Sequence, residues 1–214
     1  MLKSIPSYFK PLDWELHLFW LINHSWKNIF FDYLMPILSS STFWGIIIAC
    51  FLLYCLGKKR FYLVIYLILA LCWVGINDFT SNIPKKQIGR IRPLNALPGC
   101  HFFEDNVWHT RPKNFTPSKP RGTSYPSAHA ANSFLLCALL GFKFRRLKKY
   151  LWFIPLVIGY SRIYLGKHYP LDILAGYLWG LVFFLLFLAC YYWGETKYEQ
   201  TNWFRRIFKT EEQI

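Results

Sequence analysis

The sequence predicts an all-α protein, a polytopic bundle of transmembrane helices, and three observations support that prediction. The 214 residues are 54% hydrophobic and 21% aromatic, with a mean hydropathy of +0.21, too apolar for an ordinary soluble domain. The apolar residues gather in runs that approach the roughly 17–25 residues needed to cross hydrocarbon. The formal charge of +14 falls between these runs, which indicates membrane topology and an anionic substrate rather than a nucleic-acid partner.

The first 40 residues are predicted to form an amphipathic helical region at the membrane surface. Tryptophan, leucine and phenylalanine are mixed there with histidine, asparagine, lysine and aspartate. That mixture is typical of the membrane interface rather than of the hydrocarbon. A sixth span over residues 14–38 is the alternative.

Five spans are predicted to follow, at residues 41–57, 61–83, 126–141, 150–165 and 170–194. Residues 1–214 would form a single membrane domain, in which 84–125 are a polar active-site loop and 195–214 a charged tail. Gly176 and Gly180 in the fifth span have the spacing that favours close helix packing.

Basic residues set the predicted orientation. Those at 58–60, at 143–149 and in the tail are each separated by two spans, so all lie on one side, which the positive-inside rule makes cytoplasmic. The loop 84–125 and the turn at 166–169 then share the opposite surface, which faces the periplasm or exterior.

Ionisable residues gather at the junction of the last two apolar runs, where charge is costly and therefore indicates function. Arg162 and His168 precede Pro170, a residue suited to the first position of a helix. Asp172 then lies in the first turn, where it can accept a hydrogen bond from His168 and favour the charged imidazole. The structural alternative is a hydrogen bond that closes a turn, beside an arginine that reaches the interface.

A second cluster begins where the second span ends. If the helix continues past Pro84, Lys85 and Arg92 fall along one side, and both side chains suit phosphate oxygens. A basic collar at the end of a membrane helix is the alternative. Asp78, near the outer end of the same span, is a candidate partner for one of these cations.

The third cluster opens the span at 126–141. With Pro126 at the helix start, the N–H groups of Ser127, Ala128 and His129 are unpaired donors of the first turn. Such an N-terminus binds anions, the Ser127 hydroxyl adds a donor, and His129 is placed to transfer a proton. A capped helix with an interfacial histidine is the alternative.

Together these clusters resemble the three-part signature of the type 2 phosphatidic acid phosphatase superfamily. The matching residues are Lys85-x6-Arg92-Pro93, Pro126-Ser127-Ala128-His129 and Ser161-Arg162-x5-His168-x3-Asp172. The resemblance covers residues 85–172, and one fixed position departs from it. Alanine at 128 stands where the family usually has glycine, and it retains the backbone N–H.

The resemblance implies a role for each matched residue. His168 would be the nucleophile that forms a phosphohistidine, Asp172 would orient it, and His129 would be the general acid. The groups implied to hold the phosphate are Lys85, Arg92, Ser127, Ala128 through its N–H, and Arg162. No metal and no cofactor are implied.

The function expected is that of a metal-independent lipid phosphatase in a bacterial inner (plasma) membrane, with a phospholipid or isoprenoid-phosphate substrate taken from the bilayer. Undecaprenyl diphosphate is the first substrate expected, and phosphatidylglycerophosphate, phosphatidate and lipid A phosphate are alternatives. No nucleic acid and no obligate protein partner are indicated. The alternative of another class is a non-catalytic lipid-binding membrane protein.

Overall fold

A computed structural model describes residues 9–117, 121–198 and 201–208 of the chain. In chain order the elements are α1 (Asp13–Trp20), the π-helical turn η2 (Leu21–Ser25), α2 (Ile29–Ser39), α3 (Ser41–Gly57), α4 (Phe61–Ile88), α5 (Pro93–Ala96), β1 (His101–Glu104), β2 (Val107–Thr110), α6 (Ala128–Lys143), the 3₁₀ turn η3 (Arg145–Leu147), α7 (Lys148–Leu151), α8 (Phe153–Tyr164), α9 (Pro170–Tyr198) and α10 (Asn202–Phe208).

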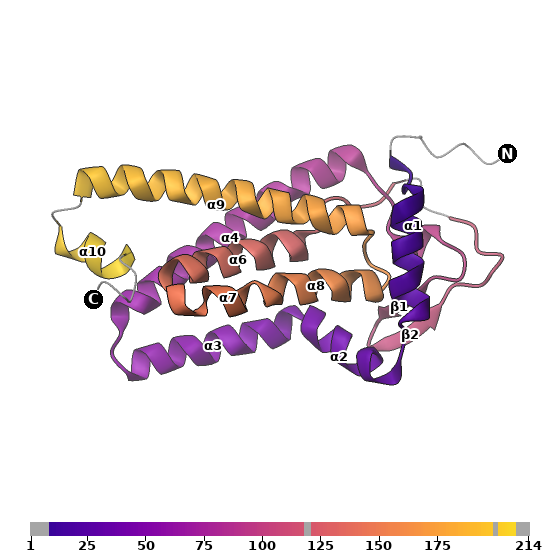
Figure 1. Cartoon of the computed structure of the whole chain (residues 1–214), viewed down its shortest axis with the longest axis horizontal. Coiled ribbons are helices and arrows are strands. Elements are labelled where there is room, and N and C mark those ends of the chain that lie inside the picture. Colours follow the sequence, from indigo (N-terminus) through magenta and orange to yellow (C-terminus); the bar gives the residue numbers. More distant parts are fainter. Residues whose placement is uncertain (1–8, 118–120, 199–200, 209–214) are drawn as a thin grey trace.

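The long helices run side by side along the long axis of the molecule, with α6 inside the bundle (Figure 1). α6 packs against α4, α8 and α9. α1 and the hairpin β1–β2 lie at one end, and α10 lies at the other.

Two glycines set the closest of these contacts. A Cβ atom at Gly176 would lie 2.5 Å from the Ser127 carbonyl oxygen, and one at Gly180 would lie 2.6 Å from the Ala131 carbonyl oxygen. The predicted close packing at this pair is therefore confirmed. It brings the beginning of α9, which carries Asp172, against the beginning of α6.

The helical membrane fold is confirmed, but the number of spans is not. By length and composition, two stretches of the described chain are able to cross a membrane, Phe61–Ala96 and Pro170–Tyr198, and a third is added if α2 and α3 form one span bent by 58°. α6 has 16 residues and α8 has 12, shorter than a span normally needs. The span predicted at 150–165 is shortened because the helix breaks between α7 and α8.

Two predicted boundaries were wrong. α4 continues through Pro84 to Ile88, and it ends where Gly89 takes a left-handed conformation with φ 68°. Residues 84–88 therefore belong to the helix rather than to the loop. α6 begins at Ala128 instead of Pro126, because the intervening serine is its N-cap.

The polar loop contains a β-hairpin, so the all-α prediction was wrong there. β1 and β2 are antiparallel and pair His101 with Thr110, and the rings of His101 and Trp108 stack at 4.5 Å. Asp105 and Asn106 form the turn with φ of 51° and 60°. Two positive φ angles are typical of the two-residue turns that join hairpin strands.

The N-terminal region closes the end of the bundle. α1 lies across the ends of the long helices (Figure 1), and after it the Asn23 amide donates to the carbonyl oxygens of His101 (2.7 Å) and Tyr164 (2.9 Å). Residues 1–8 of the predicted amphipathic segment lie outside the described part of the chain.

The predicted charged tail is partly helical and packed. Phe204 and Ile207 of α10 are buried, and the Lys143 ammonium donates to the Ile207 carbonyl oxygen at 2.7 Å. α10 therefore folds back against α4 and the end of α6. Residues 199–200 and 209–214 of this tail are outside the described residues.

Candidate active site

A cavity of about 790 Å³ between α3, α4, α6 and α8 brings most of the predicted site residues together. The six predicted residues that line it are Lys85, Arg92, Ala128, His129, Arg162 and His168. Ser127 and Asp172 do not line it. Residues from three separate parts of the sequence thus meet at one end of the bundle.

His168 lies in the turn that joins α8 to α9. Gly166 makes this turn possible, because its φ is 67° and a Cβ atom there would lie 2.6 Å from the His101 carbonyl oxygen. The His168 side chain is buried, and its Nδ1 lies 3.6 Å from Asp172 Oδ2. At that distance the imidazole and the carboxylate are neighbours, but they are too far apart for a hydrogen bond. Since Nδ1 faces the carboxylate, Nε2 is the nitrogen left for the cavity.

The carboxylate of Asp172 is held by three donors. It accepts hydrogen bonds from Arg90 Nη1 (2.6 Å), Ser124 Oγ (2.5 Å) and the backbone N–H of Tyr169 (2.9 Å). In the last bond, Asp172, the third residue of α9, accepts from Tyr169, the residue that precedes the helix, as in one half of a capping box. Asp172 is therefore fixed by contacts other than the predicted hydrogen bond from His168.

Arg90 in turn is enclosed on every side. Its Nη2 lies 2.8 Å and 3.0 Å from the two carboxylate oxygens of Glu15 on α1. The rings of Phe9 and Tyr169 lie 4.8 Å and 4.3 Å from the guanidinium carbon. Arg90, Glu15 and Asp172 are all buried. Buried charges of this kind are stable only when paired and hydrogen-bonded.

Sequence reasoning missed this network. Arg90 stands in a run of basic residues, and no spacing in the sequence links Glu15 to it. Ser124, which also contacts Asp172, lies just before the second signature segment, Pro126–His129, without belonging to it. The one available signal was an acidic residue, Glu15, that stands between the apolar Trp14 and Leu16 of the N-terminal helix.

Ser127 does not have the predicted position. It is wholly buried as the N-cap of α6, where its Oγ accepts the Ala130 N–H at 3.5 Å. Its own N–H donates to the Asp172 carbonyl oxygen at 2.9 Å and is not available to an anion. The backbone N–H groups of Ala128 and His129, next in the same turn, are the donors that remain for an anion.

Arg162 reaches the cavity from the last turn of α8. Its Nη1 donates to the Ser39 Oγ at 2.6 Å, so the end of α2 positions the guanidinium. With Lys85 and Arg92 it makes a group of three cations. Asp78 is the one acidic side chain among the described residues that line this cavity. The excess of positive charge suits a phosphate group.

The rest of the cavity is apolar and follows the helices. Residues of α6 line it from the beginning of the helix to Phe144, just past its end. The 16 residues of α6 span about 24 Å at 1.5 Å per residue. The other walls come mainly from α3, α4 and α8. The apolar residues that line the cavity include Ile47, Leu71, Leu136, Cys137, Leu140 and Ile154. A long apolar groove that begins at a cluster of cations fits an amphiphile with an anionic head.

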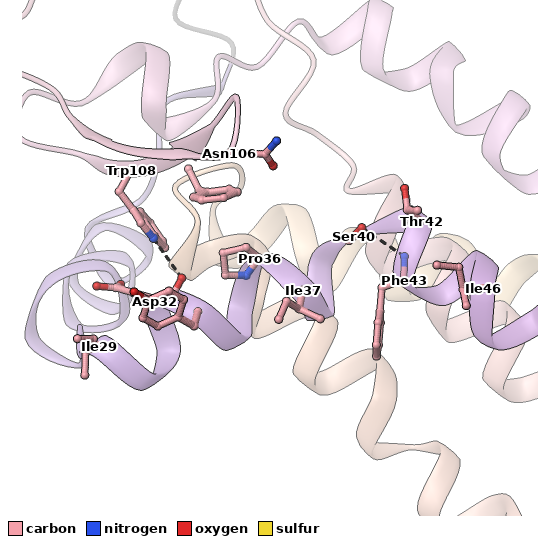
Figure 2. A pocket seen from close by; sticks show the side chains of 12 residues that line it. Ile29, Asp32, Pro36, Ile37, Ser40, Thr42, Phe43, Ile46, Asn106 and Trp108 are labelled. Atoms are coloured by element: carbon pink, nitrogen blue, oxygen red, sulfur yellow. Dashed lines mark hydrogen bonds between the residues drawn. The ribbon is translucent and has the colours of Figure 1, made fainter.

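A second cavity, of about 720 Å³, lies at the break between α2 and α3 and contains none of the predicted residues. Figure 2 shows the Trp108 indole, which donates to the Asp32 carbonyl oxygen at 3.1 Å, and the Ser40 hydroxyl, which accepts the Phe43 N–H at 3.3 Å. Its lining lacks a cluster of cations. The first cavity is therefore the candidate active site.

The fold is that of a helical membrane protein, its candidate site combines cations with an apolar groove, and comparison with known proteins gives the family. The PAP2 superfamily model matches residues 62–196. The lipid A 4'-phosphatase of Bacteroides thetaiotaomicron is 30% identical over 184 residues, which are 81% of this chain and 74% of that protein. The chain belongs to the PAP2 superfamily, as the signature predicted.

Further similarities are more distant. The undecaprenyl-diphosphatase of Sulfolobus acidocaldarius is 28% identical over 110 residues, 47% of this chain and 43% of that protein. The crystal structure of Aquifex aeolicus LpxE has a TM-score of 0.61 at 23% identity, and covers 85% of this chain and 98% of that one. A PAP2-type phosphatidylglycerolphosphate phosphatase from Bacillus subtilis has a TM-score of 0.52 at 21% identity, with 82% and 85% covered. These structures share the fold. The chain is thus an integral membrane protein of the PAP2 lipid-phosphatase type.

Proposed function

We propose that this chain hydrolyses a lipid phosphate or lipid diphosphate through a phosphohistidine formed at His168. The observation that carries the proposal is the meeting of three cations and two imidazoles at the head of an apolar groove. Phosphoryl transfer depends mostly on positioning and on neutralising charge. The cations and the first turn of α6 supply both. The lipid chains would lie in the groove.

Each step can be assigned to an atom. The Nε2 lone pair of His168 forms a bond to phosphorus while the bond from phosphorus to the lipid oxygen breaks, and His129 gives that oxygen a proton. Water then attacks phosphorus, the P–N bond breaks, and His129 takes the proton of the water. Lys85, Arg92 and Arg162 hold the phosphoryl oxygens throughout, together with the N–H groups that open α6.

Ser127 and Asp172 have supporting roles in this proposal. Ser127 caps α6 and thereby orients the N–H groups that meet the phosphate. Asp172 lies beside Nδ1 of His168 and stabilises the positive charge that develops on the ring as Nε2 forms its bond.

Among the candidate lipids, we propose a lipid A-type phosphate ahead of undecaprenyl diphosphate. The similarity to the lipid A 4'-phosphatase extends over 81% of this chain, whereas that to the undecaprenyl-diphosphatase extends over 47%. The basic segment 143–149 lies at the end of the bundle opposite the site. By the positive-inside rule we propose that the site faces the periplasm or exterior of the inner membrane.

Phosphate release by the purified protein in detergent tests the function. We expect inorganic phosphate from at least one of four lipids, namely a lipid A phosphate, undecaprenyl diphosphate, phosphatidylglycerophosphate and phosphatidate. We expect the same rate with a metal chelator present, because protein cations neutralise the phosphate. No release from any of the four would reject the enzyme in favour of a lipid-binding protein. Release abolished by chelator would reject the metal-independent mechanism.

The pH dependence of kcat/KM is expected to show the environment of His168. Burial lowers the pKa of this imidazole to about 4, and the positive charge of Arg162 acts in the same direction, whereas the nearby Asp172 carboxylate opposes them. Burial therefore outweighs the carboxylate, the reverse of the sequence-based expectation. The nucleophile is the neutral ring, so it remains active as the pH falls until that pKa is reached. We expect the acid limb near pH 4, and a limb near 6.5, the ordinary pKa of histidine, would contradict the assignment.

A further inference from the structure

Two polar residues interrupt the apolar wall of the groove next to the phosphate-binding end. Asp78 of α4 and Asn132 of α6 both line the cavity. The Asn132 amide donates to Asp78 Oδ1 at 2.8 Å, and it accepts from the amide of Asn77, a wholly buried residue, at 2.6 Å. This chain of hydrogen bonds gives the Asn132 side chain one orientation.

The carboxylate of Asp78 keeps hydrogen-bonding capacity toward the cavity. One of its oxygens accepts from Asn132, and the other has no hydrogen bond within the described chain. No ion pair within 4 Å joins Asp78 to Lys85 in the described chain, although the carboxylate is close enough to interact electrostatically with the Lys85 ammonium. The Asp78 side chain is exposed and lines the cavity, and an ionised carboxylate only accepts hydrogen bonds, so its free oxygen is available to donors from whatever occupies the cavity.

The position of the pair relative to the phosphate-binding residues follows from helix geometry. Asp78 precedes Lys85 by seven residues, so it lies on the same face of α4 about 10 Å farther along the helix. Asn132 follows His129 by three residues on α6, one turn deeper into the bundle. Farther along α4, beyond the pair, the wall becomes apolar, for example at Leu71. A lipid with its phosphate at the cations and its chains in the groove must pass alongside the hydrogen-bonded pair of Asp78 and Asn132.

A carboxylate at this depth is costly, which indicates a function rather than chance. We propose that Asp78 and Asn132 form a subsite for hydroxyl or amide N–H groups that the lipid carries beside its phosphate. The subsite rests on the proposed function and narrows its substrate to lipids with a phosphorylated sugar or polyol head. A polyprenyl chain brings only C–H groups to this position and leaves the carboxylate desolvated without a donor. Sites built to bond a polar group discriminate strongly against analogues that lack it.

The test compares two substrates in the same detergent, a lipid whose phosphate is on an acylated glucosamine and a polyprenyl phosphate. The readout is the ratio of their kcat/KM values. For Asp78→Ala we expect this ratio to fall about 10- to 100-fold, the range for loss of a hydrogen bond to a charged group. Asp78→Asn keeps the shape and the bond to Asn132, and it should give a smaller fall.

The matched control is Thr80→Ala. Thr80 is on the same helix, does not line the cavity, and hydrogen-bonds its own helix through the Ile76 carbonyl oxygen. We expect the substrate ratio of this variant to match that of the wild type.

The outcomes separate the subsite from the function. If the ratio of kcat/KM values is unchanged in Asp78→Ala and Asp78→Asn while phosphate is still released, the subsite is rejected. The phosphatase function is then unaffected. A wild type that hydrolyses neither lipid overturns the function instead. Thermal stabilisation by the glucosamine phosphate lipid then decides on the subsite: its loss in Asp78→Ala supports the proposal, and its persistence in that variant rejects it.

Discussion

His168→Ala is expected to abolish phosphate release, with a loss of about 10⁴- to 10⁶-fold in kcat, as is typical when an enzyme loses its nucleophile. The imidazole is the one group proposed to form a covalent bond to phosphorus, and alanine leaves nothing to replace it. Folding should be little affected, because the ring makes no hydrogen bond at Nδ1 in the described chain. Initial rates of phosphate release in detergent measure the loss, and thermal unfolding checks the fold.

Two further variants make the result specific. His129→Ala should lose about 10²- to 10⁴-fold, the usual contribution of a general acid. Lys113→Ala is the control, because Lys113 is an exposed basic residue of the same loop region and does not line the cavity. Comparable losses in His129→Ala and Lys113→Ala would refute the assigned roles, as would a His168→Ala protein that still releases phosphate at a rate close to wild type.

Arg90→Ala is expected to reduce both stability and activity. It would leave the carboxylates of Glu15 and Asp172 buried without their shared cation, which typically destabilises a protein by about 3–5 kcal/mol. Asp172 would also lose its contact with the guanidinium, so its carboxylate would hold the neighbouring His168 ring less firmly. A displacement of about 1 Å at a reacting group can lower the rate about 10²-fold. Thermal unfolding and phosphate release measure the two effects.

The controls for Arg90 separate charge from packing. Lys86→Ala removes an exposed cation four residues earlier and should change stability by less than about 0.5 kcal/mol. Glu15→Gln keeps the shape of the network. Its loss of stability should lie between that of Lys86→Ala and that of Arg90→Ala. Because Arg90 does not line the cavity, kcat should fall more than KM rises. A fall confined to KM would show that Arg90 contacts the lipid instead.

The sequence pointed to those site residues whose ionisable side chains are energetically costly in apolar surroundings. Lys85, His129, Arg162 and His168 are polar groups at the ends of apolar runs, where an ionisable side chain needs a reason. Arg90 was missed although it lies two residues from Arg92. The left-handed turn at Gly89 and the packing of α1 decide that one arginine faces the cavity and the other faces Asp172, and neither is visible in the spacing.

Local boundaries failed for a similar reason. A cap such as Ser127 depends on where the next helix packs, here on the Asp172 carbonyl oxygen that accepts its N–H. The hairpin of residues 101–110 was missed because its strands are four residues each and its turn, Asp105-Asn106, lacks the usual glycine.

The sequence by itself determined the helical membrane character, the family and most of the residues that line the proposed site. Hydropathy, periodicity and the cost of buried charge act within single segments, so they can be read without coordinates. Only the tertiary structure decided which groups hold Asp172, how Ser127 is used, and that Asp78 and Asn132 face the groove. Those contacts join segments far apart in the chain, and their geometry is set by the packing of α1, α4, α6 and α9 against one another.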